Sequence, residues 1–349
     1  MENIVEDKSI SNKDKIESGR ETYNWGLDLI RVLAMFFVVL VHSTSFYGFV
    51  GAEMSSFVTF MAGAGRYLSY TCIPLFLILT GYLNGNKQPG FAYYTKLLKV
   101  IIEFLLCAVI IFIINRFCLG YDCSFVPSYS WYINMYIGLF LLAPFLNYLY
   151  QGIPDKYKWG FIITLLLVFS YPHVTSYWAV GYPIMFYFIG SFLKDKQFKI
   201  KKYILLIGIV GICIVQTVMA KLDLSIYNPN SHNNIGCVVL SVAIFLLFYD
   251  LKVAKNTNTI KVVKPLRIIA NASLSTFLIS EIFENMTVNM FNKLELISFA
   301  DRLPHLAYLT PLKFIVSVIC GLIISFVAVQ LYRLVVKIIE KCRCVSKSK

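Results

Sequence analysis

Long apolar runs recur along nearly the whole of this 349-residue chain, and short polar or basic connections separate them. Each run is about twenty residues long, which is the length of helix that crosses the hydrocarbon core of a bilayer. The strands of a membrane β-barrel would alternate apolar and polar positions and would be about half as long. The pattern therefore predicts an all-α integral membrane protein.

Ten of these runs have the length and hydropathy expected of transmembrane helices. They are 25–48, 57–83, 97–117, 131–150, 159–173, 178–193, 203–220, 234–250, 268–290 and 312–336. We expect residues 25–338 to form one ten-helix transmembrane domain. We expect residues 1–24, which mix basic and acidic side chains, to be a disordered cytoplasmic tail, and residues 339–349 to be a basic cytoplasmic tail.

Composition and charge support this assignment. Hydrophobic residues make up 58% of the chain and charged residues only 15%, against about 25% charged in soluble domains. Of the 32 lysines and arginines, 25 fall in alternate connections and at the two ends, so the positive-inside rule places those connections and both termini in the cytoplasm. The net charge of +13 is therefore a topology signal. The basic residues are scattered, without interleaved aromatic residues, so we expect membrane lipids as partners and no nucleic acid.

The first apolar run carries two side chains that are costly at membrane depth, Arg31 and His42. Eleven helical steps make three turns and about 20°, so both lie on one helix face, about 16 Å apart along the axis. Asp28, three residues before Arg31, is placed to pair with the guanidinium. Two interpretations are equally supported by these residues alone. One is a functional face on an aqueous tunnel, and the other is a structural arginine with a histidine satisfied by a neighbouring helix.

The remaining histidines and the cysteines add little chemistry. His173, His232 and His305 fall in outer connections, where we expect them to be surface residues. The nine cysteines show no metal-ligand spacing, so no metal site is predicted. Cys118 and Cys123 share an outer loop, and the sequence is compatible either with a disulfide between them or with two free thiols.

Several segments resemble the membrane-bound acyltransferase-3 family. Residues 27–34 and 41–43, with Arg31 and His42 separated by ten positions, resemble the family's opening helix, whose mark is a basic residue, ten positions and a histidine. Segments that resemble its second-helix, central and sixth-helix sequences follow at 73–83, 131–144 and 181–190, and the resemblance covers about 25–332.

Four positions depart from the family pattern. Lys96 and Lys99 stand where many relatives have two arginines at the start of the third helix. An arginine can bind a phosphate through two parallel hydrogen bonds, whereas a lysine provides only a compact positive charge. Thr80 stands where serine is usual, and Phe283 stands where the ninth helix often has a histidine. His42 is then the only histidine that we predict within the membrane.

The resemblance implies transfer of an acyl group, usually acetyl, from cytoplasmic acyl-CoA to a hydroxyl of a cell-surface polysaccharide or its lipid-linked precursor. The expected location is the bacterial cytoplasmic membrane. In this interpretation His42 is the general base, since the ordinary pKa of histidine is about 6.5. Arg31, oriented by Asp28, supports the site electrostatically, and Lys96 and Lys99 hold the donor's phosphates. An ordinary topological role for the two lysines is equally supported.

Five further residues are candidates for contact with the acceptor: Trp131, Tyr132, Asn134, Glu284 and Asn285. Aromatic residues at a membrane interface are more often simple anchors. Two functions from other classes also remain open. A transporter or translocator of a glycan precursor would be a similar bundle with buried charges, although repeated halves and paired broken helices, which we do not detect, would be expected. A non-catalytic membrane partner module is the second alternative.

Overall fold

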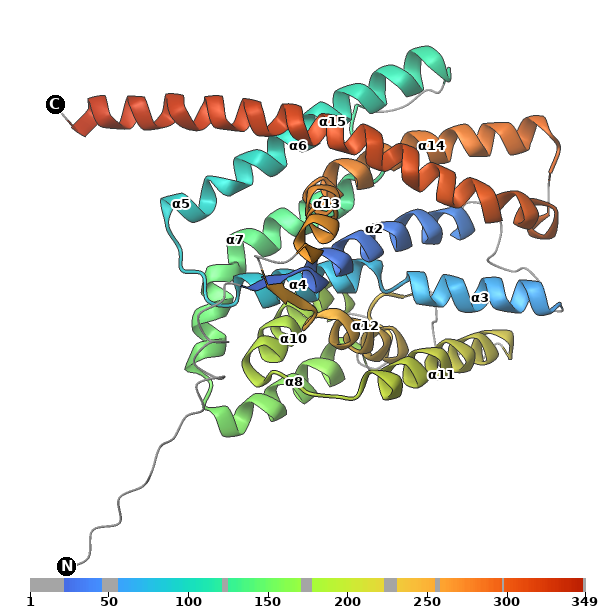
Figure 1. Cartoon of the computed structure of the whole chain (residues 1–349), viewed down its shortest axis with the longest axis horizontal. Coiled ribbons are helices and arrows are strands. Elements are labelled where there is room, and N and C mark those ends of the chain that lie inside the picture. The colour runs from blue at the N-terminus through green and yellow to red at the C-terminus, as the bar shows by residue number, and fades with distance from the viewer. Residues whose placement is uncertain are drawn as a thin grey trace, which may run out of the picture.

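The computed structural model describes residues 22–45, 56–120, 125–170, 178–222, 231–254, 258–296 and 298–347, and nearly all of them are helical (Figure 1). In chain order the elements are β1 (Thr22–Asn24), α2 (Gly26–Ser45), α3 (Phe57–Ser69), α4 (Cys72–Asn84), α5 (Phe91–Tyr94), α6 (Lys96–Ile113), η1 (Ile114–Cys118), α7 (Ser130–Gly152), α8 (Asp155–Ser170), η2 (Ala179–Gly181), α10 (Tyr182–Lys196), α11 (Lys202–Lys221), α12 (Ile235–Phe248), β2 (Lys252–Ala254), α13 (Thr259–Asn271), α14 (Ser273–Lys293) and α15 (Phe299–Lys347). His173 and Cys123 lie outside the described residues.

Each predicted apolar run contains a helix, but the helices differ in length. In the described part of the chain, six helical stretches are long and apolar enough to cross a membrane, and a bent pair of helices is a seventh candidate. The runs at 159–173, 178–193 and 234–250 overlap α8, α10 and α12, which have 16, 15 and 14 residues. At 1.5 Å per residue these three are shorter than a hydrocarbon core of about 30 Å. Ten crossings therefore stay a prediction.

Two predicted runs are broken helices. The run 57–83 consists of α3 and α4, separated at Tyr70 and Thr71. The run 268–290 includes the end of α13 and most of α14, which meet at Ala272 with a bend of 64°. Polar backbone at such a break is tolerated where it is buried in protein or lines a cavity.

Both ends of the predicted domain differ from expectation. Residues 22–24, the last three of the predicted tail, form β1, which pairs antiparallel with β2. At the other end α15 continues as helix to Lys347, well into the predicted tail at 339–349.

In Figure 1, α2, α6 and α14 run towards the right of the view, and α7 and α15 return to the left. We call the two ends of the bundle the Arg31 end and the His42 end, after their positions on α2.

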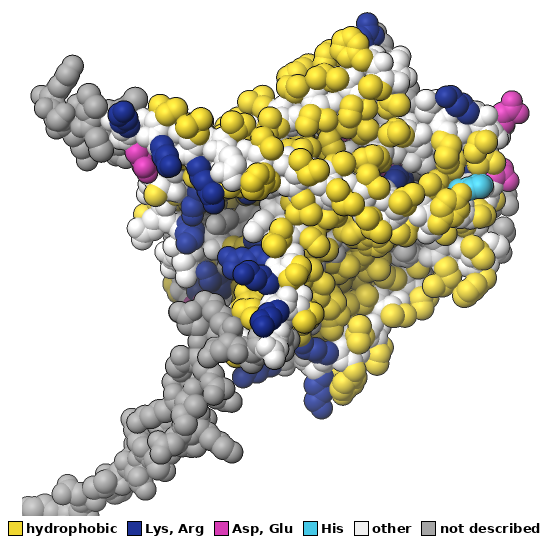
Figure 2. Space-filling model, turned by 45° about the horizontal axis from the view of Figure 1, so that its top comes forward, with side chains coloured by type: hydrophobic (Ala, Val, Ile, Leu, Met, Phe, Trp, Pro, Cys, Tyr) yellow, Lys and Arg dark blue, Asp and Glu magenta, His cyan; other side chains and the backbone are white. Residues whose placement is uncertain are grey.

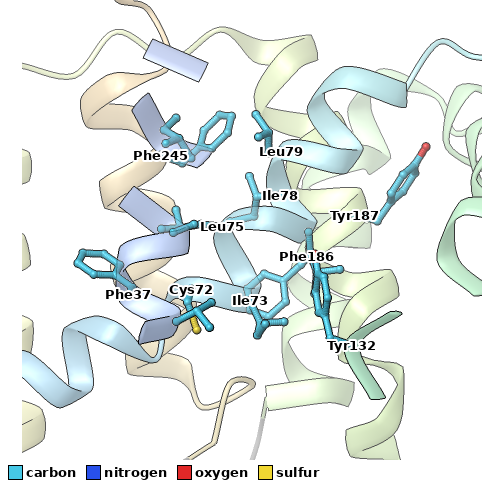
Figure 3. Packing of buried hydrophobic residues seen from close by; sticks show 14 of the residues in the cluster. Phe37, Cys72, Ile73, Leu75, Ile78, Leu79, Tyr132, Phe186, Tyr187 and Phe245 are labelled. Carbon is cyan, nitrogen blue, oxygen red and sulfur yellow. The ribbon is translucent and has the colours of Figure 1, made fainter. Parts of the chain in front are cut away.

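The core lies where α4 meets α2, α10 and α12. Figure 3 shows α4 side chains such as Leu75 and Ile78 among buried residues of these neighbours, which include Phe37, Phe186 and Phe245. Each of the five is at most 5% exposed, which is typical of close-packed protein interiors.

Two glycines set the distance between α4 and α10. A Cβ atom on Gly190 would lie 2.0 Å from the carbonyl oxygen of Ile78, and one on Gly81 would lie 1.9 Å from the carbonyl oxygen of Tyr187. Small residues allow such close backbone approach between membrane helices. Both glycines belong to the segments that resemble the acyltransferase-3 family. The close contact between the two backbones gives a packing reason for glycine at both positions.

Replacing Gly190 with alanine should destabilise the bundle. The added methyl group meets backbone of the opposing helix, and overpacking of this kind typically costs about 1–3 kcal/mol. Thermal unfolding of the purified protein in detergent measures the effect. Gly208→Ala in α11 is the matched control, because a Cβ there meets nothing within 4 Å. Equal unfolding temperatures for the two variants would contradict the packing role of Gly190.

Candidate functional site

A cavity of about 360 Å³ lies between α2, α4, α6, α7 and the break between α13 and α14. We call it the Arg31 cavity. Its wall is polar near the Arg31 end, with Arg31, Lys96 and Lys99, and becomes largely apolar towards Ile73 and Phe277. A cavity with cations at one end and apolar walls beyond them is suited to a long ligand with an anionic end and a neutral arm.

Arg31 is held at the cavity wall by residues from the start of the bundle. Its guanidinium donates to the Asp28 carboxylate at 3.0 Å, as the three-residue spacing predicts. The Tyr23 hydroxyl of β1 donates to the other carboxylate oxygen at 2.5 Å. Asp28 is buried whereas the Arg31 side chain is 27% exposed. The pair therefore presents the guanidinium, and not the carboxylate, to the cavity.

Lys96 and Lys99 lie on the same cavity wall, as the donor hypothesis requires. Lys99 also pairs with the buried Glu103 at 3.3 Å, and the Ser325 hydroxyl of α15 donates to that carboxylate at 3.0 Å. We did not single out Glu103 from the sequence, although its four-residue spacing from Lys99 is the signature of a helical ion pair. Its carboxylate offsets part of the positive charge of the wall.

His42 lies beyond the apolar end of the Arg31 cavity. Its half-buried ring stacks on Tyr129 with ring centres 4.3 Å apart. Val38, four residues before His42 on the same helix face, lines the cavity, whereas His42 is not among the lining residues. Within the described residues the Arg31 cavity therefore ends before His42, and a continuous tunnel that joins Arg31 to His42 stays a prediction. Aromatic rings occupy the intervening space.

Two buried cations surround the residues that follow His42. Lys313 of α15 donates to the Ser43 hydroxyl at 2.6 Å and to the Glu284 carboxylate at 2.7 Å. Arg66 of α3, 2% exposed, donates to the Thr44 hydroxyl at 3.1 Å. Both cations fall within predicted apolar runs, near the end of a run or of a helix, and the sequence did not single out either of them as buried. The His42 end of α2 is thus embedded in a hydrogen-bonded polar cluster.

The five candidate acceptor contacts do not converge. Tyr132 lines the Arg31 cavity, and Glu284 binds Lys313 as described. Trp131 is 42% exposed, and its ring lies near His232, with centres 6.4 Å apart. Asn134 is exposed on α7 and is not a cavity residue. Asn285 donates to the side chain of Asn115 at 3.4 Å.

His232 is not the simple surface residue that its position in a connection suggested. It is half-buried among the rings of Tyr70, Trp131 and Tyr182, and its Nδ1 lies 2.9 Å from the Tyr70 carbonyl oxygen. That oxygen can only accept, so Nδ1 carries the proton in this contact. His305 is also half-buried, with Nδ1 2.7 Å from the Tyr308 hydroxyl.

Several helices that are long and apolar enough to cross a membrane, packed around a cavity with a cationic wall, define the class of protein, a multi-pass membrane protein. Comparison with known families then gives the activity class. The model of the acyltransferase-3 family, described as an acyltransferase domain, matches residues 24–330, so the chain belongs to this family and is a membrane acyltransferase. The comparisons with curated proteins and with solved structures gave no match.

Proposed function

We propose that this acyltransferase transfers an acyl group, acetyl in the first instance, from acyl-CoA to a hydroxyl of a cell-surface polysaccharide or its lipid-linked precursor. The Arg31 cavity is the observation that carries the proposal. Coenzyme A joins a polyanionic nucleotide to a neutral pantetheine arm, and the cavity has Arg31, Lys96 and Lys99 at one end and apolar walls beyond them. The thioester then points along α2 towards His42.

In the proposed reaction the acceptor hydroxyl oxygen bonds to the thioester carbonyl carbon, and the carbon–sulfur bond breaks. His42 takes the hydroxyl proton and passes it to the departing thiolate, a general-base contribution of about 10² to 10⁴ in rate. An acyl group carried first by His42 itself would give the same products. Incubation with labelled donor in the absence of acceptor separates the two routes, since only the second leaves label on the protein.

The orientation proposed is that of the sequence prediction, with the Arg31 end in the cytoplasm of a bacterial cell. Figure 2 supports it, because Lys and Arg side chains on the face shown gather mainly at the left, the Arg31 end, while hydrophobic side chains cover the middle. Acyl-CoA is then available at the Arg31 end. The acceptor meets the site from the His42 end, where Trp131 offers an exposed ring for stacking against a sugar.

Thioester cleavage tests the proposed function. Purified protein in detergent, given acetyl-CoA, should release free thiol slowly alone and faster with extracted envelope glycan or its precursor. Cells that carry the gene should also incorporate labelled acetyl groups into envelope glycan, and cells without it should not. Absence of both effects would contradict the proposal and favour the translocator or partner-module alternatives, neither of which cleaves a thioester.

Removing the two cavity lysines should weaken donor binding. One hydrogen bond to a charged group contributes about 1.5–3 kcal/mol, so the double variant Lys96→Gln, Lys99→Gln should raise the KM for acetyl-CoA at least about tenfold. The matched control changes Lys201 and Lys202 to glutamine at the start of α11, because neither lines the Arg31 cavity. An unchanged KM in the Lys96 and Lys99 variant would leave those lysines only a topological role.

A further inference from the structure

A stack of three rings, those of His42, Tyr129 and Phe277, leads from His42 to the wall of the Arg31 cavity. The His42 ring stacks on Tyr129 at 4.3 Å between ring centres, and Tyr129 stacks on Phe277 at 5.2 Å, each pair within 21° of parallel. Phe277 is a cavity-lining residue, whereas Tyr129 and His42 are not. The rings of Tyr129 and Phe277 therefore lie between the cavity wall and the imidazole, and we call these two rings the partition.

Contacts with neighbouring residues hold this partition in place. The carboxylate of Glu281, one helical turn after Phe277 on α14, accepts from the backbone N–H groups of Ser128 and Tyr129 at 3.1 and 3.2 Å. Tyr132 packs edge-on against Phe277, with ring centres 5.3 Å apart. Tyr129 and Phe277 are each 3% exposed. Neither ring is thus a mobile surface group. Phe277 belongs to α14, and Glu281 of the same helix holds the backbone of Tyr129.

The partition lies where the acyl group must be in the proposed reaction. A thioester in the Arg31 cavity has its acyl group directed at the apolar end, against Phe277. General-base catalysis by His42 requires the attacking hydroxyl within about 3 Å of the imidazole, directly or through one water. The acyl carbonyl can meet that hydroxyl only at the partition, so the rings decide how much acyl chain fits and whether water can follow.

We propose that Phe277, backed by Tyr129, is the specificity-determining residue for the acyl chain and excludes water from the bound thioester. This inference rests on the proposed function. A short acyl group such as acetyl fits in the space in front of the Phe277 ring. A longer acyl chain does not, because each added methylene group clashes with that ring. Water that passed the partition would add to the carbonyl carbon, the carbon–sulfur bond would break, and free acid and CoA thiol would be released without transfer.

The test compares acetyl-CoA with hexanoyl-CoA for the full-length protein in detergent, with and without glycan acceptor. One methylene in a fitted pocket changes kcat/KM by about 10- to 200-fold. We therefore expect Phe277→Ala to raise the hexanoyl-to-acetyl ratio of kcat/KM at least tenfold, and to raise acceptor-independent hydrolysis of acetyl-CoA several-fold. Phe277→Leu should give intermediate values, and it keeps the test valid if the alanine variant does not fold.

Phe291→Ala is the matched control, because it removes an equally buried ring from the same helix, outside the Arg31 cavity. It should lower stability and leave the acyl preference unchanged. If folded Phe277 variants keep the preference and hydrolysis rate of the unaltered protein, the role of Phe277 is overturned while the proposed function stands. If the unaltered protein cleaves no thioester with any acceptor, the proposed function fails, and this inference with it.

Discussion

Replacing His42 with alanine should lower the rate of acyl transfer by a factor of about 10² to 10⁴, the usual contribution of a general base. The variant loses the proton acceptor but none of the cations of the Arg31 cavity, so the KM for acetyl-CoA should change little. Release of CoA thiol in the presence of glycan acceptor, compared with the unaltered protein at equal concentration, measures the loss.

A second substitution separates chemistry from packing at this position. His42→Phe keeps a ring to stack on Tyr129 but provides no base, so it should be as inactive as the alanine variant and closer to normal stability. His305→Ala is the matched control, since His305 lies near the start of α15 and does not line the Arg31 cavity. Transfer retained by His42→Phe would contradict a base role for His42.

Replacing Lys313 with methionine should destabilise the protein by about 3–5 kcal/mol, because one partner of a buried ion pair would be left uncompensated. The side chains of Lys313 and Glu284 are only 5% and 4% exposed, and their charged groups are 2.7 Å apart. Thermal unfolding in detergent, without ligand, measures the effect. Adding Glu284→Gln to the variant removes the stranded charge and should restore a large part of the stability.

Lys202→Met provides the matched control for this pair. Lys202 and Asp250 are 3.2 Å apart, but their side chains are 46% and 51% exposed. Exposed pairs contribute about 0–1 kcal/mol, so this variant should unfold almost at the normal temperature. Similar small shifts for Lys313→Met and Lys202→Met would show that the Lys313 pair does not stabilise the bundle.

The sequence was most informative where physical effects are local. Each predicted apolar run contains a helix, because hydropathy over twenty residues reflects the bilayer directly. The Asp28–Arg31 ion pair was predicted from helical spacing and is confirmed at 3.0 Å. Lys96 and Lys99 were expected to lie together at a helix mouth, and they share the wall of the Arg31 cavity with Arg31. Whether any of them binds donor stays a prediction.

The features that the sequence did not predict depend on partners far along the chain. Lys313 contacts Ser43, 270 residues away, and Arg66 contacts Thr44, 22 residues away, so counting charges could not distinguish these buried cations from surface ones. The partition between the Arg31 cavity and His42 is formed by Tyr129 and Phe277, which come from separate segments. Helix geometry predicts that Arg31 and His42 lie on one face of α2, but it does not predict which side chains from other helices pack against that face.

The two-stranded sheet bears on the order in which the bundle folds. Asn24 of β1 donates to the Tyr249 carbonyl oxygen, a contact across 225 residues, and β1 pairs with β2 just beyond it. Contacts so distant in sequence form late, and membrane helices emerge from the ribosome in order. Tyr23, which braces the Asp28–Arg31 pair, therefore reaches its final position only after α12 has been synthesised. The Arg31 end of the cavity is therefore a late product of biogenesis, so a partly inserted chain lacks the complete cavity wall that we propose for the donor.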